Sequence, residues 1–156
     1  MFKITLIVVG KIKKDYENLE KEFTKRIKSF ADLQTIEIPE GKTNDKERNK
    51  VIEGERILTS LPNGDNAPIF ITLDEHGQEL NSIAFANLLN NEKNFGKGKI
   101  LFVIGGPYGL SSSILNQAKM KLSLSKMTFT HQMARLFFLE QLYRAFTIIE
   151  KKTYHY

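Results

Sequence analysis

The feature that most constrains the fold of this chain is a regular alternation of short apolar runs with longer amphipathic segments. The apolar runs are rich in Val, Ile, Leu and Phe and predict buried strands at residues 2–9, 33–38, 67–73, 99–104 and 120–125. Apolar residues at helical spacing predict helices at residues 15–30, 51–58, 82–89 and 130–151, with a further one starting at 111–113. Such alternation predicts a single α/β domain over residues 1–156, with a mainly parallel sheet flanked by helices.

Local signals place the connections between these elements. Asn44 and Glu47 have the spacing of a capping pair at the start of the second helix. The polar residues 74–78 predict a turn directly after the third strand. Serines at 111–113 predict an N-cap for the helix that follows.

The composition excludes several classes of protein. Apolar residues make up 41% and charged residues 26%, which is typical of a globular chain rather than a disordered one. The absence of cysteine excludes disulfides, a thiolate nucleophile and cysteine-based metal sites. The three histidines share no metal-binding spacing, so we expect no metal. The opening apolar run is too short for a signal peptide or a membrane span, and we expect a soluble, cytoplasmic protein.

Charge is distributed unevenly along the chain. Residues 1–92 hold 13 Lys and Arg against 16 Asp and Glu, whereas residues 93–156 hold 10 Lys and Arg against two acids. One interpretation is that an acidic and a basic face attract each other within the fold or between subunits. The size of the basic excess favours the other interpretation, a nucleic-acid surface on the C-terminal half.

The last predicted helix, residues 130–151, is apolar over nearly its whole circumference. A helix that packs on a single core needs an apolar stripe of only about 100° around its axis. A second buried side is therefore expected, and a homodimer through this helix would supply it, with Phe138 and Leu142 at the contact. The alternative cover is the polar loop at residues 40–50.

Two segments are candidates for chemistry. Residues 101–110 (LFVIGGPYGL) place glycines after a buried strand, where a ligand can approach the backbone. They match neither a dinucleotide fingerprint nor a P-loop. Residues 121–132 (KLSLSKMTFTHQ) offer backbone groups and an apolar slot suited to a flat aromatic ligand. A tight turn would also explain the first segment, and an edge strand with a helix cap the second.

In combination, residues 101–110, 123–131 and 140–145 and the tail Tyr154-His155 resemble the large-subunit rRNA pseudouridine N3-methyltransferases, which belong to the SPOUT class. The resemblance covers nearly the whole chain. It implies a homodimer that uses S-adenosylmethionine (SAM) and has a C-terminal trefoil knot, an exception to the usual rule against threaded chains. The implied substrate is a pseudouridine in helix 69 of 23S rRNA within the assembled ribosome.

The same resemblance implies roles for particular residues. SAM contacts fall on Leu73, on Gly105, and on Leu124, Ser125, Lys126, Met127, Thr128 and Phe129. Tyr154 and His155 match a pair that the family places near the target base. The match breaks at Tyr156, where the family usually has Arg or Lys.

Methylation of N3 requires alignment of the reacting atoms and stabilisation of the N3 anion as it forms. Candidates are a cation at Arg135 or Arg144 and a base at His155. Glu140 lies four residues before Arg144, a spacing that also predicts a simple helix pair. We expect His131 to order a loop and His76 to be exposed.

Two other functions remain open from sequence alone. One is a non-catalytic ribosome- or RNA-binding protein that uses the same basic face, which SAM binding would distinguish. The other is an enzyme acting on a small molecule of the nucleotide or CoA type, which salt-dependent ribosome binding would distinguish.

Overall fold

The computed structural model describes residues 1–156 and contains one five-stranded sheet of order β2-β1-β4-β3-β5. All its pairings are parallel, which confirms the α/β prediction. The strands are β1 (Lys3–Val9), β2 (Asp32–Ile38), β3 (Ile69–Glu79), β4 (Lys99–Ile104) and β5 (Met120–Ser123). The helices are the 3-10 turn η1 (Lys14–Tyr16), α1 (Glu17–Ile27), α2 (Lys46–Ser60), α3 (Ser82–Asn94), α4 (Ser112–Gln117) and α5 (His131–Ile149).

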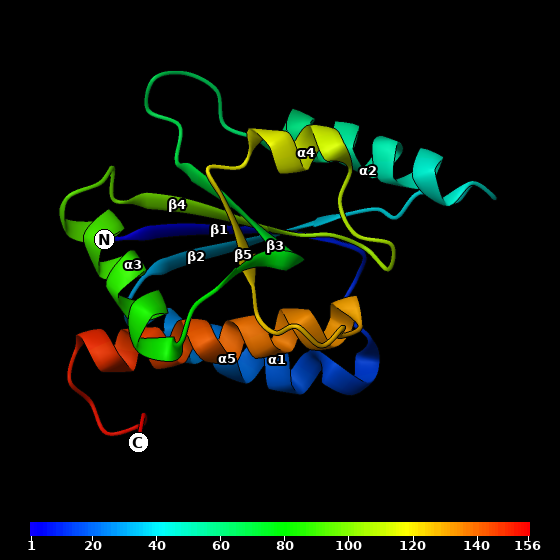
Figure 1. The fold of residues 1–156 in the computed structure, drawn as a ribbon. Coiled ribbons are helices and arrows are strands. Elements are labelled where there is room, and N and C mark those ends of the chain that lie inside the picture. Colours follow the sequence, from blue (N-terminus) through cyan, green and yellow to red (C-terminus); the bar gives the residue numbers. More distant parts are fainter.

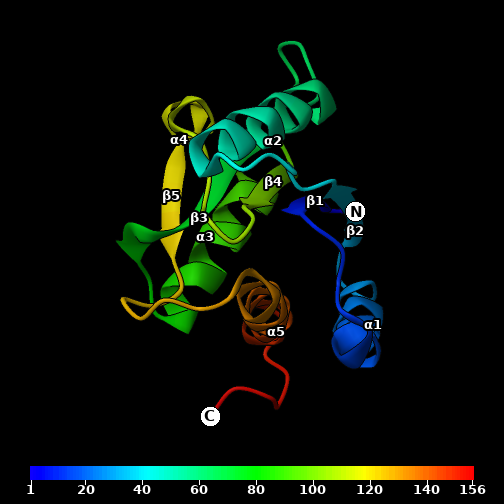
Figure 2. The same ribbon diagram turned by 90° about the vertical axis from the view of Figure 1, so that its right-hand side faces the viewer.

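Helices cover both faces of the sheet. Helices α1, α3 and α5 lie on one face and α2 and α4 on the other, as Figures 1 and 2 show from two sides. In β1, Leu6 and Val8 pack on the side of α5, whereas Ile7 and Val9 pack on the side of α2. Because both faces are buried, the strand reads as a continuous apolar run rather than as an alternating one. No helix combines the length and the apolar character that crossing a membrane would require.

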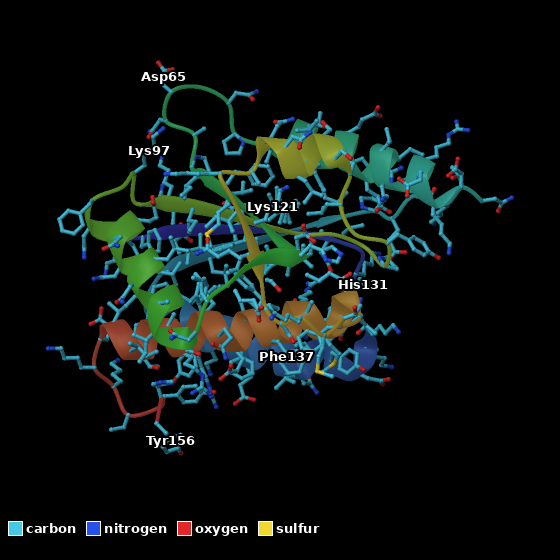
Figure 3. All side chains as sticks on the ribbon, viewed as in Figure 1. Asp65, Lys97, Lys121, His131, Phe137 and Tyr156 are labelled. Carbon is cyan, nitrogen blue, oxygen red and sulfur yellow. The ribbon has the colours of Figure 1, made fainter.

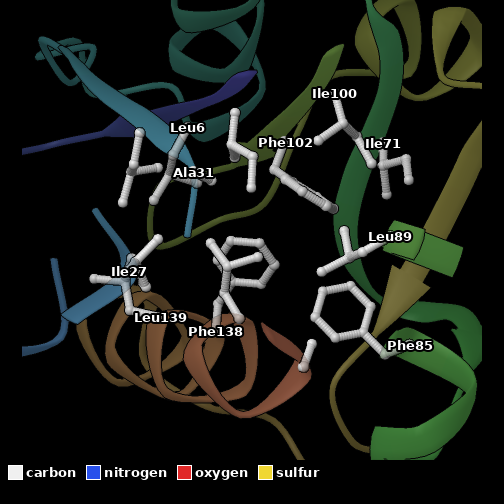
Figure 4. Packing of buried hydrophobic residues seen from close by; sticks show 14 of the residues in the cluster. Leu6, Ile27, Ala31, Ile71, Phe85, Leu89, Ile100, Phe102, Phe138 and Leu139 are labelled. Carbon is white, nitrogen blue, oxygen red and sulfur yellow. The ribbon is translucent and has the colours of Figure 1, made fainter. Parts of the chain in front are cut away.

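The larger core lies between the sheet and α5 (Figure 4). Phe138 of α5 is fully buried, with its ring centroid 4.7 Å from that of Phe102 in β4 and 6.1 Å from that of Phe85 in α3. These aromatic contacts attach α5 to the centre of the sheet.

The apolar character of α5 is satisfied within the chain. Its neighbours are the sheet, α1 and α3, so that both Phe138 and Leu142 are completely buried in the chain's own core. The prediction that these two residues form the subunit contact is therefore wrong. The loop at residues 40–45 leads into α2 on the opposite face, so it is not the cover either. Phe137, which is 43% exposed, is the large apolar residue of α5 that remains at the surface.

Strand β3 continues where a turn was expected. It runs through residues 74–78 to Glu79, with a register shift in which Leu73 and Gln78 both pair with Leu122. A side chain at Gly77 would bring its Cβ within 2.5 Å of the Lys121 carbonyl oxygen, so glycine permits this close pairing. The turn prediction was wrong because β5 supplies a hydrogen-bonding partner that local polarity does not reveal.

Of the two predicted helix caps, one differs from its prediction and one is confirmed. Helix α2 is capped by Asp45, whose carboxylate accepts bonds from the amides of Glu47 and Arg48, rather than by Asn44. The expected cap of α4 is confirmed, since the Ser111 hydroxyl accepts from the Ile114 amide.

A buried and an exposed phenylalanine provide a test of this packing. Phe138→Ala removes a ring from the centre of the core and is expected to lower the free energy of unfolding by roughly 3–5 kcal/mol. Phe95→Ala, at a residue that is 87% exposed, is the matched control and is expected to change it by less than about 1 kcal/mol. Urea unfolding followed by circular dichroism measures both, and equal losses would contradict the packing described.

Candidate ligand-binding site

The main candidate site is a cavity of about 450 Å³ at the carboxyl ends of β4 and β5, beside the middle of β3. Its wall combines residues 73–76 of β3, the glycine loop (Gly105–Gly109) and the segment from Leu124 to Phe129. Parallel strands bring their carboxyl ends to one edge of the sheet, where α/β folds bind ligands. The predicted residues that line it are Leu73, Gly105, Leu124, Ser125, Met127, Thr128 and Phe129.

The glycine loop is a tight reversal of the backbone after β4. The Gly109 amide donates to the Gly106 carbonyl at 3.1 Å, and Gly109 has a φ of +86°, which favours glycine. A Cβ at Gly105 would lie 2.8 Å from the Gly109 carbonyl carbon. A larger residue at position 105 would therefore displace the loop itself, in addition to approaching a ligand.

The opposite wall, residues 124–129, is held by hydrogen bonds to β3. The Ser123 hydroxyl bridges the carbonyls of Glu75 and Ser125 at 3.0 and 2.8 Å. The Thr128 hydroxyl donates to a Glu75 carboxylate oxygen at 2.6 Å. The unexpected extension of β3 thus supplies the support of this wall.

Lys126 is the one predicted cofactor residue that does not line the cavity. Its side chain is 87% exposed, and its ammonium lies 3.8 Å from the carboxylate of Glu79. The backbone of Lys126 therefore lies beside the cavity, whereas its side chain points away from the cavity.

His131 lines the cavity at the start of α5, with its Nε2 3.5 Å from a carboxylate oxygen of Glu40. Burial lowers the pKa of His131, and Glu40 opposes that shift. The next residue, Gln132, accepts from the Lys13 amide at 2.9 Å and donates to the Lys11 carbonyl at 2.8 Å. Gln132 therefore orders residues 11–13, and His131 contacts Glu40 in the loop before α2. His76 is exposed, as expected.

Sequence reasoning missed Glu53, a buried acid beside the glycine loop. The Gly41 amide donates to Glu53 Oε2 at 2.8 Å, and a Cβ at Gly106 would lie 3.3 Å from Glu53 Oε1. Burial raises the pKa of this carboxyl, and the Gly41 hydrogen bond partly opposes the rise. The sequence does contain a signal for the burial of Glu53: it lies four residues before the buried Ile57, and that spacing places both side chains on one face of α2.

The guanidinium of Arg135 faces carboxylates rather than the cavity. It donates to both oxygens of Glu20, at 2.5 and 2.7 Å, and to Glu37 at 2.9 Å. The side chain is almost completely buried and ties α5 to α1 and β2. These contacts are those of a residue that joins secondary structure elements.

The C-terminal tail is docked on α5. The Tyr154 hydroxyl donates to Glu140 Oε1 at 3.1 Å, and its ring lies under the Arg144 guanidinium at 4.9 Å. Burial, followed by the charge of Glu140, raises the pKa of Tyr154. Nδ1 of His155 lies 3.3 Å from Arg144 Nη1. Glu140 and Arg144 do form the expected helix pair, at 2.6 Å, and that pair also anchors the tail.

Within one chain the tail and the cavity are far apart. The cavity reaches Ala134, whereas the tail contacts Arg144, and ten residues of helix span about 15 Å. Figure 3 shows His131 and Tyr156 at opposite ends of α5. The structure therefore does not bring the two groups of predicted site residues together in one chain.

Four of the ten basic residues of the C-terminal half do not share one face. Lys97 lies at the amino edge of the sheet and Lys126 beside the cavity, while Arg135 is buried and Arg144 is paired with Glu140 (Figure 3 labels Lys97). These four residues therefore do not build a common basic surface.

Comparison with known proteins identifies the family. A model described as predicted SPOUT methyltransferase matches residues 2–155. The chain is 43% identical over 158 residues to ribosomal RNA large subunit methyltransferase H of Phocaeicola vulgatus, covering 99% of both chains. It is 42% identical to the protein of that name from Halothermothrix orenii, covering 98% of this chain and 99% of the other. The chain belongs to the large subunit methyltransferase H family of SPOUT methyltransferases.

Membership in this family confirms the resemblance drawn from the glycine loop, the segment before α5 and the tail. The fold is also similar to that of a solved protein, a probable methylase family protein from Haemophilus influenzae. That similarity has a TM-score of 0.53 at 17% identity and covers 99% of this chain and 70% of the other.

The buried Glu53 predicts a pH-dependent effect on stability. The pKa of Glu53 in the folded state lies above the ordinary value of 4.5. The neutral carboxyl is more stable in this buried position than the ionised one, and this contribution to stability is fully present below pH 4.5. It is lost as the pH rises through the folded-state pKa. Glu53→Gln, which keeps a carbonyl acceptor for the Gly41 amide, is therefore expected to gain stability relative to the wild type between pH 4.5 and pH 7. Urea unfolding of both proteins across this range measures the difference, and a difference that does not change with pH would contradict the burial.

Proposed function

We propose that this chain is a SAM-dependent methyltransferase that modifies N3 of a pseudouridine in helix 69 of 23S rRNA, acting on the assembled ribosome as a single SPOUT domain. Membership in a family of large-subunit rRNA methyltransferases supports the reaction and the substrate class. The observation that carries the proposal is the cavity at the carboxyl edge, because three segments predicted for SAM meet there.

The cavity suits SAM in size and in chemistry. Its volume of about 450 Å³ lies in the range of small-molecule sites. Leucines at 73, 122 and 124 offer apolar surface for an adenine ring, and the glycine loop exposes backbone groups that can bond its edge. The side chains of Asp74 and Glu75 supply negative charge for a sulfonium and an amine. Bound SAM would supply an electrophilic methyl group.

The tail residues can stabilise the N3 anion of the substrate. An Arg guanidinium only donates hydrogen bonds, so in the contact with Arg144 Nδ1 of His155 is the acceptor, which leaves Nε2 to donate to a substrate. His155 then donates a hydrogen bond to a ring oxygen over which the N3 charge spreads. The ring of Tyr154 offers a surface for stacking an unpaired base. This geometry favours His155 as a donor over His155 as a base, so the N3 proton leaves to water as the N3–methyl bond forms and the sulfonium–methyl bond breaks. Arg135 is left out because its donors are engaged by Glu20 and Glu37.

A homodimer would bring these two parts together. The tail lies about 15 Å along α5 from the cavity of its own chain, so a complete site needs the tail of a second copy. An apolar surface is present beside the cavity, where the rings of Phe129 and Phe137 lie 5.0 Å apart and are 37% and 43% exposed. A hollow of about 390 Å³ next to them also reaches Phe85 and Gln141. We propose this surface as the subunit contact.

The trefoil knot belongs to the same proposal. Strand β5 lies at the sheet edge beside β3, and the chain then returns to α5 beneath the centre of the sheet (Figure 2). This return from edge to centre is compatible with a threaded C-terminal segment.

Ribosomes from a strain that lacks the methylation provide the direct test. Incubation with labelled SAM should place a methyl group on the helix 69 pseudouridine, located by mapping the label on the rRNA. Gly105→Ala should abolish SAM binding in calorimetry and methyl transfer, because its Cβ displaces the glycine loop. Gly64→Ala is the control: it also replaces a glycine, at φ +101°, but in a turn with no neighbouring atom within 4 Å. A wild-type protein that binds ribosomes but not SAM would instead be a non-catalytic RNA-binding protein.

The tail tests the composite site. Deletion of Tyr154–Tyr156 should leave SAM affinity within about twofold while methyl transfer falls by at least about a hundredfold, because alignment and anion stabilisation are removed. Mixing the deleted chain with Gly105→Ala should restore transfer to about a quarter of the wild-type rate, since half of the dimers then hold one complete site. Normal transfer by the deleted chain would exclude the role of the tail. Absence of recovery on mixing, with mixed dimers verified, would contradict a site shared between copies.

A further inference from the structure

A second hollow lies at the amino edge of the sheet, opposite the cavity described above. It lies between the start of β3, the end of α3 and the loop that precedes β4, and has a volume of about 450 Å³. Its lining residues are Ala67, Pro68, Ile69, Asn91, Glu92, Phe95, Gly96, Lys97 and Lys119. The proposed methyl-transfer site uses none of these residues.

Phe95 presents its ring to solvent at this hollow. The side chain is 87% exposed, although its backbone is fixed by the bond from its amide to the Asn91 carbonyl at 2.8 Å. Gly98, with a φ of +66°, turns the chain into β4. The ring is therefore accessible to a molecule that occupies the hollow.

Lys97 and Lys119 line the hollow together with this ring, and Lys99 begins β4 directly after the loop. Lys97 donates to the carbonyls of Asp65 and Ala67 at 2.7 and 3.2 Å, which fixes the ammonium without neutralising its charge. Lys99 and Lys119 take part in no ion pair, whereas Lys93 lies 3.7 Å from Glu150. Figure 3 shows Lys97 and Asp65 together at this edge.

The carboxylates at this edge do not make its charge negative. Glu92 lines the hollow, and its side chain lies against Gly96, where a Cβ would meet Glu92 Oε2 at 2.4 Å. Asp65 approaches Lys97 through its backbone carbonyl. Among the charged residues that line the hollow, the two lysines Lys97 and Lys119 outnumber the single acid Glu92.

We propose that this hollow binds an unpaired nucleotide of the RNA substrate, with the base stacked on Phe95 and the neighbouring phosphates on Lys97, Lys99 and Lys119. An aromatic ring among ammonium groups is the combination that binds single-stranded nucleic acid. The Asn91 amide and the Glu92 carboxylate offer a donor and acceptors to the base edge. A protein partner of apolar character would instead leave these lysines desolvated without counter-charge.

The position of the hollow relative to the tail supports an RNA contact, and this part of the argument rests on the proposed function. The ion pair of Lys93 and Glu150 joins the end of α3 to the end of α5. The tail begins at the end of α5, so the loop of Phe95 and the tail leave the same edge of the fold. An RNA whose target base lies at Tyr154 can therefore continue toward Phe95.

Binding of ribosomal large subunits by the full-length protein tests the proposal. Phe95→Ala and the double variant Lys99→Glu/Lys119→Glu should each weaken binding roughly tenfold. The double variant should also flatten the salt dependence of binding by about 0.7 in log–log slope for each phosphate that a lysine no longer neutralises. SAM affinity should be unchanged. The control Lys21→Glu/Lys25→Glu makes the same charge change on exposed residues of α1 and should leave binding within about twofold.

Other outcomes of these experiments would contradict the proposal. Unchanged affinity and salt slope in both test variants would overturn the proposal, as would equal weakening by the α1 control. A change in oligomeric state with Phe95→Ala, seen by light scattering, would show that the hollow is a protein contact instead.

Failure of the proposed function would be recognised separately. If the wild-type protein transfers no methyl group to ribosomes, binding of a fluorescent ten-residue oligouridine still tests the hollow. Weakening by Phe95→Ala would then support a nucleotide site on its own, and absence of wild-type binding would overturn it.

Discussion

The pairing of β4 with both β1 and β3 is the constraint on which the rest of the structure depends. This central strand carries Phe102 toward α5 and Val103 toward α2, so both helical layers are anchored on it. Its two ends also define the two edges of the molecule. The glycine loop follows its last residue, and the loop that holds Phe95 and Lys97 precedes its first. A parallel sheet fixes these loops at opposite ends of one buried strand, which is why the proposed SAM cavity and the proposed nucleotide hollow face in opposite directions.

The strands and helices were largely predictable because burial on both faces leaves a strong local signal. The extension of β3 was not, since its partner β5 lies more than 40 residues away and a register shift at Gly77 joins them. The sequence correctly indicated that α5 is apolar on more than one side, but the second side was assigned to a contact with another subunit. A helix beneath the centre of a sheet has α1 and α3 as lateral neighbours, and periodicity does not distinguish these from a partner subunit.

The candidate site was predictable where its residues follow strand ends. Gly105 and the segment from Leu124 follow β4 and β5. Leu73, which was expected to end its strand, lies within β3 and pairs with Ile104, the last residue of β4; all of these residues line the cavity. Charged residues were harder to place, because their roles depend on partners distant in sequence. Arg135 is engaged by Glu20 and Glu37, which lie about a hundred residues earlier, and Glu53 acquires its position from Gly41 and the glycine loop. No local pattern contains that information.

The attachment of the cavity wall to β3 has a consequence for the exchange of ligands. Residues 125–130 are held by hydrogen bonds of Ser123, Ser125 and Thr128, and the side chains of Met127 and Phe129 lie outside the main core. Local opening of such a segment breaks a few polar contacts and exposes little apolar surface, so its free energy is well below that of global unfolding. In a single chain, the free energy of opening this wall is therefore separate from that of unfolding the sheet beneath it, and the proposed subunit contact at Phe129 would raise that free energy. Entry and release of a ligand are in this way separated from the stability of the fold.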